Sequence, residues 1–332
     1  MKRRQFILSL AGTAAAGLAG WKLTGSANDV RLAKVTRTGW ALGANVRLTV
    51  FHNDQAVAEQ ALEAAFAEID RIEDIMSLYR EDSAICRLNR DGFLDHPDSA
   101  LVEVLTHARA LSARTGGAFD VTVQPLWTLY NRHAQMGTLP GDEEIRAVLS
   151  RIGWKRLEVK PERIALQGKG TEITLNGIAQ GYAADAVARV FKDHGIHSAL
   201  IDTGEIEAIG THAEKDQWSI GIKHPRKERE MLGLAGLRDR CLATSGDYES
   251  RFSAGYRDHH LLDPRTGHSP SELSSVSVAA RTALQADALS TAVFLLGLVK
   301  GRELVEITPG ADALFVTKDG RMIQTDGFPA IA

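Results

Sequence analysis

Hydrophobic residues recur every three or four positions in four stretches of the chain, which is the spacing of one face of an α-helix. The longest stretch covers residues 54–76, and a second covers 101–112 and stops at a Gly-Gly pair suited to the positive φ of a helix end. Residues 142–153 have an acidic first turn and a glycine end, and 176–191 lead from a glycine-punctuated loop into an apolar stripe. We predict a helix in each stretch.

Apolar and polar residues alternate over residues 45–52, the pattern of a half-buried β-strand. Further strands are predicted at 197–204, 218–225, 274–281 and 312–324, and the last contains an Asp-Gly hairpin signal. The strands gather late in the chain while the helices are spread along it, without regular alternation. We therefore expect an α+β fold with mixed or largely antiparallel sheets and packed helices.

The first residues have the features of an export signal. Lys2, Arg3 and Arg4 are followed by an uncharged run over residues 5–21. The arginine pair before Gln-Phe-Ile is typical of twin-arginine signals. We predict a signal peptide over residues 1–27 and a periplasmic protein, with a retained N-terminal anchor as the alternative. Residues 28–332 then form a single domain, or two subdomains.

Composition narrows the function classes. The chain has 332 residues, of which 44% are hydrophobic and 24% charged, with a net charge of −3. A nucleic-acid surface would need a basic excess, so we expect no nucleic-acid partner. The sequence lacks the Rossmann, P-loop, zincin and serine-hydrolase motifs, so those classes lose their usual support. Cys86 and Cys241 can form one disulfide after export or stay as buried thiols.

An acid stands inside an apolar stretch near the C-terminus. Residues 284–297 contain Asp287, with Thr291 four positions later, so that both oxygens project from one helical face. A buried carboxylate is costly unless it has a partner. A carboxylate with a hydroxyl is a ligand set suited to magnesium. The alternative is that Asp287 lies in the first turn of its helix and faces the positive end.

Three other segments carry polar groups of possible use in catalysis. The pair His259 and His260 precedes an Asp-Pro turn, where a histidine can act as a base or be a partly exposed turn residue. The Gly-Gly turn before Asp120 offers backbone amides to an anion or nucleotide, or simply ends a helix. Residues 243–252 predict a Thr-Ser-Gly turn leaving a strand.

Six segments in this order resemble the ApbE family, flavin transferases that move FMN from FAD onto proteins. They are "MSLYREDSAICRLN", "GGAFDVTVQPLW", "NGIAQGYAADAVA", "ATSGDYESRF", "HHLLDPRTGHS" and "ADALSTAVFLLG", within about residues 40–300. The resemblance implies an ApbE-like, T-fold-related architecture. It also implies magnesium-dependent transfer of FMN from FAD to a threonine or serine hydroxyl of a periplasmic or membrane-anchored client flavoprotein, with release of AMP.

The resemblance assigns roles to particular positions. Asp287 and Thr291 match the magnesium ligands, together with the backbone carbonyl of Gly177, and His260 matches the base. The FAD contacts fall at Leu42, Tyr79, Ala118, Phe119, Asp120, Thr174, Gln180 and, through its backbone, Leu261.

The chain departs from the family at three positions. Thr174 stands where an acid is usual, Gln180 where a lysine is usual, and Gly204-Glu205 where Gly-Gly is frequent. The missing charges put FAD affinity and turnover in doubt. Two alternatives therefore stay open, an FAD pyrophosphatase and a non-catalytic flavin carrier or assembly factor. The signal and the departures are reminiscent of the branch that serves nitrous oxide reductase maturation.

Overall fold

The computed structural model describes residues 32–331, so the predicted signal peptide lies outside the described residues. The helices are α1 (Gln55–Met76), α2 (Ala84–Asp91), α3 (Ser99–Arg114), α4 (Gln124–Gln135), α5 (Asp142–Leu149), α6 (Ala179–Asp193) and α7 (Ala283–Glu306), with 3-10 turns η1 (Val121–Val123) and η2 (Trp154–Arg156). The strands are β1 (Ala33–Ala41), β2 (Ala44–His52), β3 (Phe93–Asp95), β4 (Leu157–Val159), β5 (Arg163–Leu166), β6 (Ala199–Asp202), β7 (Ile206–Ile209), β8 (Trp218–Lys223), β9 (Met231–Leu237), β10 (Arg240–Gly246), β11 (Leu273–Ala280), β12 (Asp312–Thr317), β13 (Met322–Gln324) and β14 (Ala330–Ile331).

One large sheet organises these elements. Its strand order is β1-β2-β6-β7-β10-β11-β12-β13, and two three-stranded sheets, β14-β9-β8 and β3-β5-β4, accompany it. The pairings within the large sheet are antiparallel. This confirms the α+β expectation with antiparallel sheets.

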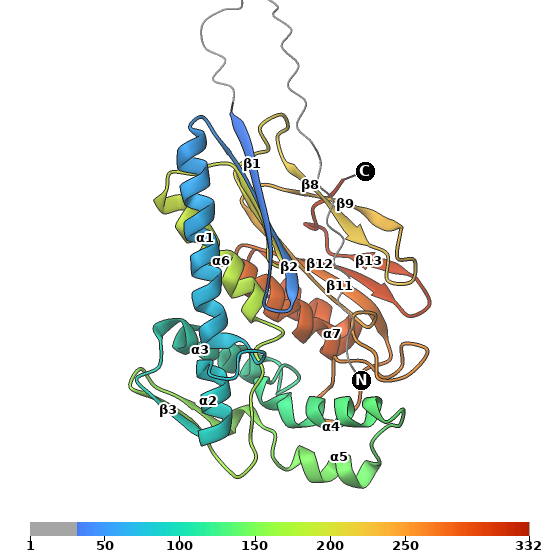
Figure 1. Ribbon diagram of the computed structural model, residues 1–332. Helices are drawn as coiled ribbons and strands as arrows, with labels where there is room; N and C mark the ends of the chain where they lie inside the picture. The colour runs from blue at the N-terminus through green and yellow to red at the C-terminus, as the bar shows by residue number, and fades with distance from the viewer. Residues whose placement is uncertain (1–31, 332) are drawn as a thin grey trace, which may run out of the picture. The chain divides into compact units, whose positions relative to one another are not determined.

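The large sheet is covered on both faces. Figure 1 shows α1, α6 and α7 side by side over one face, and the three pack against one another in that order. On β10, Cys241 and Ala243 belong to the core beneath α1 and α6, while Leu242 between them belongs to the core shared with β8 and β9. This alternation follows from the two-residue period of a strand.

Helix α7 is the core helix of the protein. The helix is long and apolar enough to cross a membrane, but 67% of its most apolar stretch is buried inside the protein. A helix that is apolar nearly all round is expected at such a place. The helix starts after its N-cap Thr282, so Asp287 lies beyond the first turn. The alternative that Asp287 faces the positive end of its own helix is therefore wrong.

Several local predictions are confirmed. Helix α1 begins at the capping Asp54, and Gly116 and Gly117 follow α3 with φ of 59° and 82°. β12 and β13 form the expected hairpin, in which Gly320 has a φ of 86°.

Two local predictions are wrong. Helix α5 ends at Leu149, not near residue 153, because the chain leaves the helix at its C-cap Ser150. Thr244 to Gly246 form the end of β10 and not a turn, because β10 keeps its pairing with β11 as far as Gly246 and Ser275.

Both cysteines are free thiols in the described part of the chain. The Cys86 Sγ lies 3.8 Å from the carbonyl oxygens of Ser77 and Leu78. Cys241 is buried in β10, within a different hydrophobic cluster. The disulfide alternative is therefore not realised in this structure.

Candidate active site

A cavity of about 580 Å³ collects most of the predicted site residues. This volume falls in the range of about 300–1,000 Å³ that is usual for small-molecule sites. The lining includes the β1–β2 turn, the turn before η1, the loop before α6, the β6–β7 turn, the end of β10, the His260 loop and α7. An adjoining cavity of about 160 Å³ shares Gly43, Asn176 and Gln180 with the first. The predicted residues lining the larger cavity are Ala118, Phe119, Asp120, Thr174, Gly177, Gln180, His260, Leu261, Asp287 and Thr291, and those lining the smaller are Leu42, Tyr79 and again Gln180.

Asp287 is buried at the edge of this cavity, with 3% of its surface exposed. Its Oδ2 accepts a hydrogen bond of 2.9 Å from the backbone N–H of Gly181, in the first turn of α6. The carboxylate therefore lies at the positive end of a neighbouring helix. Burial raises the pKa of Asp287 to about 7, and the nearby Asp185 adds to the rise.

Thr291 and Gly177 lie close to each other in the cavity wall. A Cβ at Gly177 would lie 3.0 Å from Thr291 Oγ1, so the glycine backbone packs directly against this hydroxyl. Thr291 Oγ1 is 3.1 Å from Ser245 Oγ at the end of β10. A carboxylate, a hydroxyl and a backbone carbonyl are the ligand types that a hard divalent cation prefers. These three residues thus fit a magnesium ion.

His260 is the histidine of the cavity wall. His260 is half-buried in the cavity wall, and its Nδ1 is 3.3 Å from Ser250 O. Burial lowers the pKa of His260, so the ring is neutral near pH 7. When Nδ1 carries the proton, its N–H donates a hydrogen bond to Ser250 O and Nε2 keeps a free lone pair. This is the state that a general base requires.

The turn at Asp120 is held together by its own carboxylate. Asp120 Oδ1 accepts hydrogen bonds from Thr122 N at 2.8 Å and Thr122 Oγ1 at 2.7 Å. Its Oδ2 accepts one from Trp154 N at 2.6 Å. Both oxygens are engaged within the protein, so this side chain acts first by shaping the turn. Ala118 and Phe119 are buried beside it and line the same cavity.

Gln180 lies where the two cavities meet. Its side-chain Nε2 donates a hydrogen bond of 3.4 Å to Leu42 O, and its backbone carbonyl oxygen accepts one of 2.9 Å from Thr203 Oγ1. Thr174 is a neutral residue of the larger cavity whose Oγ1 accepts a hydrogen bond from Asn176 N. Tyr79 is 73% exposed at the smaller cavity.

Sequence reasoning missed two polar residues of the site. Glu205 lines the cavity with 8% of its surface exposed, and its Oε2 accepts a hydrogen bond of 3.2 Å from Thr244 N. Burial, together with the charge of Asp287, holds the pKa of Glu205 well above its usual range. Ser245 contacts Thr291, as described above, and also Ser290. Glu205 was visible in the sequence only as a departure from a Gly-Gly pair.

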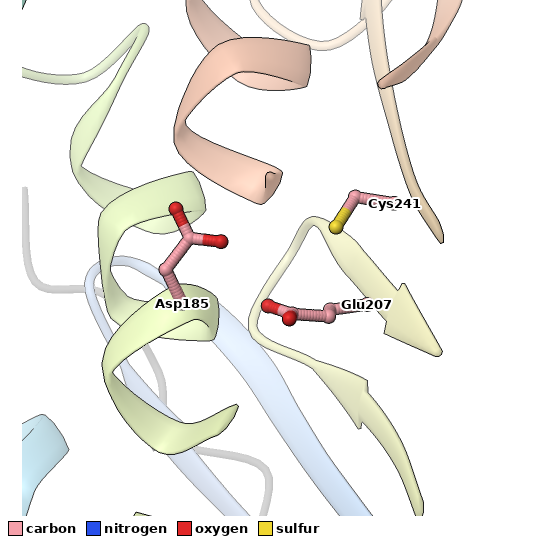
Figure 2. Close-up of side chains that lie close together, drawn as sticks. All are labelled: Asp185, Glu207 and Cys241. Carbon is pink, nitrogen blue, oxygen red and sulfur yellow. The ribbon is translucent and has the colours of Figure 1, made fainter. Parts of the chain in front are cut away.

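A second group of ionisable side chains, none of which lines the cavity, lies between α6, β7 and β10 (Figure 2). Asp185 of α6, Glu207 of β7 and Cys241 of β10 have ligand-type atoms within 4.8 Å of one another. Asp185 accepts hydrogen bonds from the backbone N–H groups of Ala283 at 2.7 Å and Leu284 at 3.0 Å. Burial and the Asp185 carboxylate raise the pKa of Glu207 to about 8, so Glu207 is largely protonated at neutral pH. Within the described residues this group joins α6 to the start of α7.

Comparisons with known proteins show which family and which solved structures the chain resembles. The model of the ApbE family matches residues 42–315. The FAD:protein FMN transferase of Treponema pallidum is 30% identical over 319 residues, covering 90% of this chain and 88% of that protein. The flavin transferase ApbE from Vibrio cholerae superposes with a TM-score of 0.81 at 25% identity, covering 90% of this chain and 100% of the other. The ApbE protein of Thermotoga maritima has a TM-score of 0.79 at 31% identity, with 89% and 97% covered.

Proposed function

The chain belongs to the ApbE family of FAD:protein FMN transferases, and we propose that it moves FMN from FAD to a threonine or serine hydroxyl of a client protein in a magnesium-dependent reaction. One observation carries the proposal: Asp287, Thr291, Gly177 and His260 come from three distant segments and line one cavity. Asp287, Thr291 and Gly177, called the cation set below, are groups suited to a divalent cation, and they line the same cavity as a neutral histidine. Phosphoryl transfer depends mainly on such charge neutralisation and positioning.

Each residue has a defined task in this reaction. Asp287, Thr291 and the Gly177 carbonyl would hold Mg²⁺, which supplies positive charge to the pyrophosphate oxygens of FAD when bound. His260 Nε2 takes the proton of the client hydroxyl. The hydroxyl oxygen forms a bond to the phosphorus on the FMN side. The bond from that phosphorus to the bridging oxygen breaks, and AMP leaves with that oxygen.

The departures from the family pattern have a limited effect on this scheme. Thr174 and Gln180 line the cavity as neutral groups, so they can donate hydrogen bonds to FAD but add no charge. Neither residue belongs to the cation set or contributes the base. We therefore expect weaker FAD binding than in relatives with charges at these positions, with the same chemistry.

We also propose that the protein acts in the periplasm after twin-arginine export. The support for this proposal is the sequence of residues 1–27, which opens with an arginine pair and continues without charge. A client flavoprotein with a periplasmic domain would meet the enzyme there.

Mass spectrometry tests the proposed function. Residues 28–332 are incubated with FAD, Mg²⁺ and a candidate periplasmic client, and we expect the mass of one FMN to be added at one threonine or serine. Asp287→Ala should abolish the transfer, because the cation set loses its only charged member among the three ligands. Free FMN and AMP formed without a client would instead indicate a pyrophosphatase. Bound FAD that never turns over with any client would indicate a flavin carrier.

A further inference from the structure

We propose that Glu205 is a second carboxylate ligand of the cation that Asp287, Thr291 and Gly177 hold. The proposal rests on the cation site of the proposed function and extends it. Within the described residues, Glu205 and Asp287 are the two carboxylates of the cavity that are more than nine-tenths buried and keep an oxygen free. The site would then hold a divalent cation with two charged ligands before FAD arrives.

Glu205 is tied to Asp287 through the start of α6. Thr203 Oγ1 donates a hydrogen bond of 2.9 Å to Gln180 O, and a Cβ at Gly204 would lie 2.7 Å from Gln180 Nε2. Gly204 has a φ of 102°, so only a glycine allows this close approach without strain. The next residue of α6, Gly181, gives its N–H to Asp287. The start of α6 therefore contacts both the turn that carries Glu205 and the carboxylate of Asp287.

Glu205 is tied to Thr291 through the end of β10. Its Oε2 accepts a hydrogen bond of 3.2 Å from Thr244 N, and the next residue, Ser245, places its Oγ 3.1 Å from Thr291 Oγ1. These contacts link Glu205 to two of the three residues of the cation set, to Asp287 through α6 and to Thr291 through β10. The carboxylate of Glu205 is thereby held in the part of the cavity that Asp287 and Thr291 also line.

The charges around the cavity leave the two carboxylates without a protein counter-ion. Each binds one backbone N–H with one oxygen, and no hydrogen-bond partner for Glu205 Oε1 or Asp287 Oδ1 occurs in residues 32–331. The part of the cavity wall that the structure describes contains no lysine or arginine. Two carboxylates in a desolvated site repel each other unless a cation or a proton lies between them. Carboxylate oxygens are the ligands that Mg²⁺ and Mn²⁺ prefer.

Manganese binding in the absence of FAD tests the role of Glu205. Metal-free protein, residues 28–332, is titrated with Mn²⁺ while the electron paramagnetic resonance signal of the free ion is followed. Glu205→Gln keeps the shape of the side chain and removes its charge, and we expect its Mn²⁺ affinity to fall at least about tenfold. Glu205→Ala is a second variant that cannot retain a ligand oxygen and should show the same loss.

Glu249→Gln is the matched control, because Glu249 lines the same cavity but is exposed and paired with Lys223 at 3.3 Å. Its Mn²⁺ affinity should equal that of the wild type. Thermal unfolding of all variants in EDTA reports separately whether the fold is kept.

The outcomes separate this proposal from the one on which it rests. Unchanged Mn²⁺ affinity in both Glu205 variants, with binding lost in Asp287→Asn, would overturn the role of Glu205 and leave the cation site intact. Mn²⁺ binding that survives Asp287→Asn, or that is missing from the wild type with and without FAD, would overturn the cation site itself.

Discussion

His259 and His260 are adjacent in the sequence but have different chemical surroundings. His260 lines the cavity, whereas His259 is 0% exposed and packs edge-on against Phe294 with ring centroids 5.5 Å apart. His259 Nε2 is 3.2 Å from Pro270 O, within the core. Only His260 can reach a substrate hydroxyl, so a base in this pair must be His260.

Replacing His260 should separate binding from chemistry. For His260→Ala we expect nearly unchanged FAD affinity and transfer slower by about 10²- to 10⁴-fold, the usual contribution of a general base. FAD affinity is measured by fluorescence titration and transfer by mass spectrometry of the client. His197→Ala, at an exposed histidine that does not line the cavity, serves as the control. Transfer at the wild-type rate would remove His260 from the mechanism.

The buried His259 should make the fold sensitive to acid. Burial lowers the pKa of His259 to about 4, whereas the unfolded side chain has a pKa of about 6.5. Between pH 6.5 and pH 4 the unfolded chain binds a proton at His259 and the folded chain does not. The contribution of His259 to the free energy of unfolding is therefore fully present above pH 6.5 and is lost as the pH falls through 4. Urea unfolding should show that the free energy of unfolding declines from pH 7 to pH 4, and His259 should account for at most about 3 kcal/mol of this decline. A His259→Gln variant should lose less stability over this range, and an equal decline would contradict the assignment.

At the next scale, α6 and α7 cap each other. Asp287 of α7 accepts the N–H of Gly181 in α6, and Asp185 of α6 accepts the N–H groups of Ala283 and Leu284 in α7. A Cβ at Gly181 would lie 2.3 Å from Ala283 O, so the close crossing requires a glycine. Each carboxylate satisfies backbone donors that a helix start leaves without partners. The pair of helices thus fixes the position of Asp287.

Loss of the Asp185 cap should weaken this pair of helices. Asp185→Ala removes an acceptor from two backbone N–H groups, and we expect the free energy of unfolding to fall by about 1–2 kcal/mol. Asp185→Asn keeps one acceptor oxygen and should lose less. Asp193→Ala, at an exposed acid at the end of α6, is the control for helix propensity. Urea unfolding at pH 7 measures the series, and equal stability of all four proteins would show that the cap is unimportant.

The elements that the sequence predicted are those with a strong local pattern. Helix α1 has a regular buried stripe and a capping aspartate, and β2 alternates clearly, so both were predicted. The sequence did not reveal β1, in which only Ala41 is buried, or β3, which has three residues. Short or exposed elements carry few apolar positions, so their formation depends on neighbours that lie elsewhere in the chain.

The cavity wall is acidic, although the protein as a whole is almost neutral. The chain has a net charge of −3, yet the described cavity wall includes three buried carboxylates, Asp120, Glu205 and Asp287. A bound divalent cation would offset this local charge and make the cavity able to accept the phosphates of FAD. The overall composition contains no sign of this concentration of charge.

The export prediction also concerns the whole chain. Replacing Arg3 and Arg4 by lysine should keep the protein in the cytoplasm, because twin-arginine export depends on the arginine pair. Cell fractionation with detection of the protein measures the distribution. Lys2→Gln, which leaves the arginine pair intact, should export normally. Periplasmic accumulation of the double-lysine variant would contradict twin-arginine export.

The family, the main helices and strands, and the pair Asp287 and Thr291 could all be read from the sequence, because these features depend on local spacing and on the order of short segments. The three-dimensional fold was needed to see that Glu205 lines the same cavity as this pair, that Gly181 binds Asp287, and that His260 rather than His259 lines the cavity. Those contacts join segments far apart in the chain. Their formation depends on how helices and the sheet pack, which local periodicity does not encode.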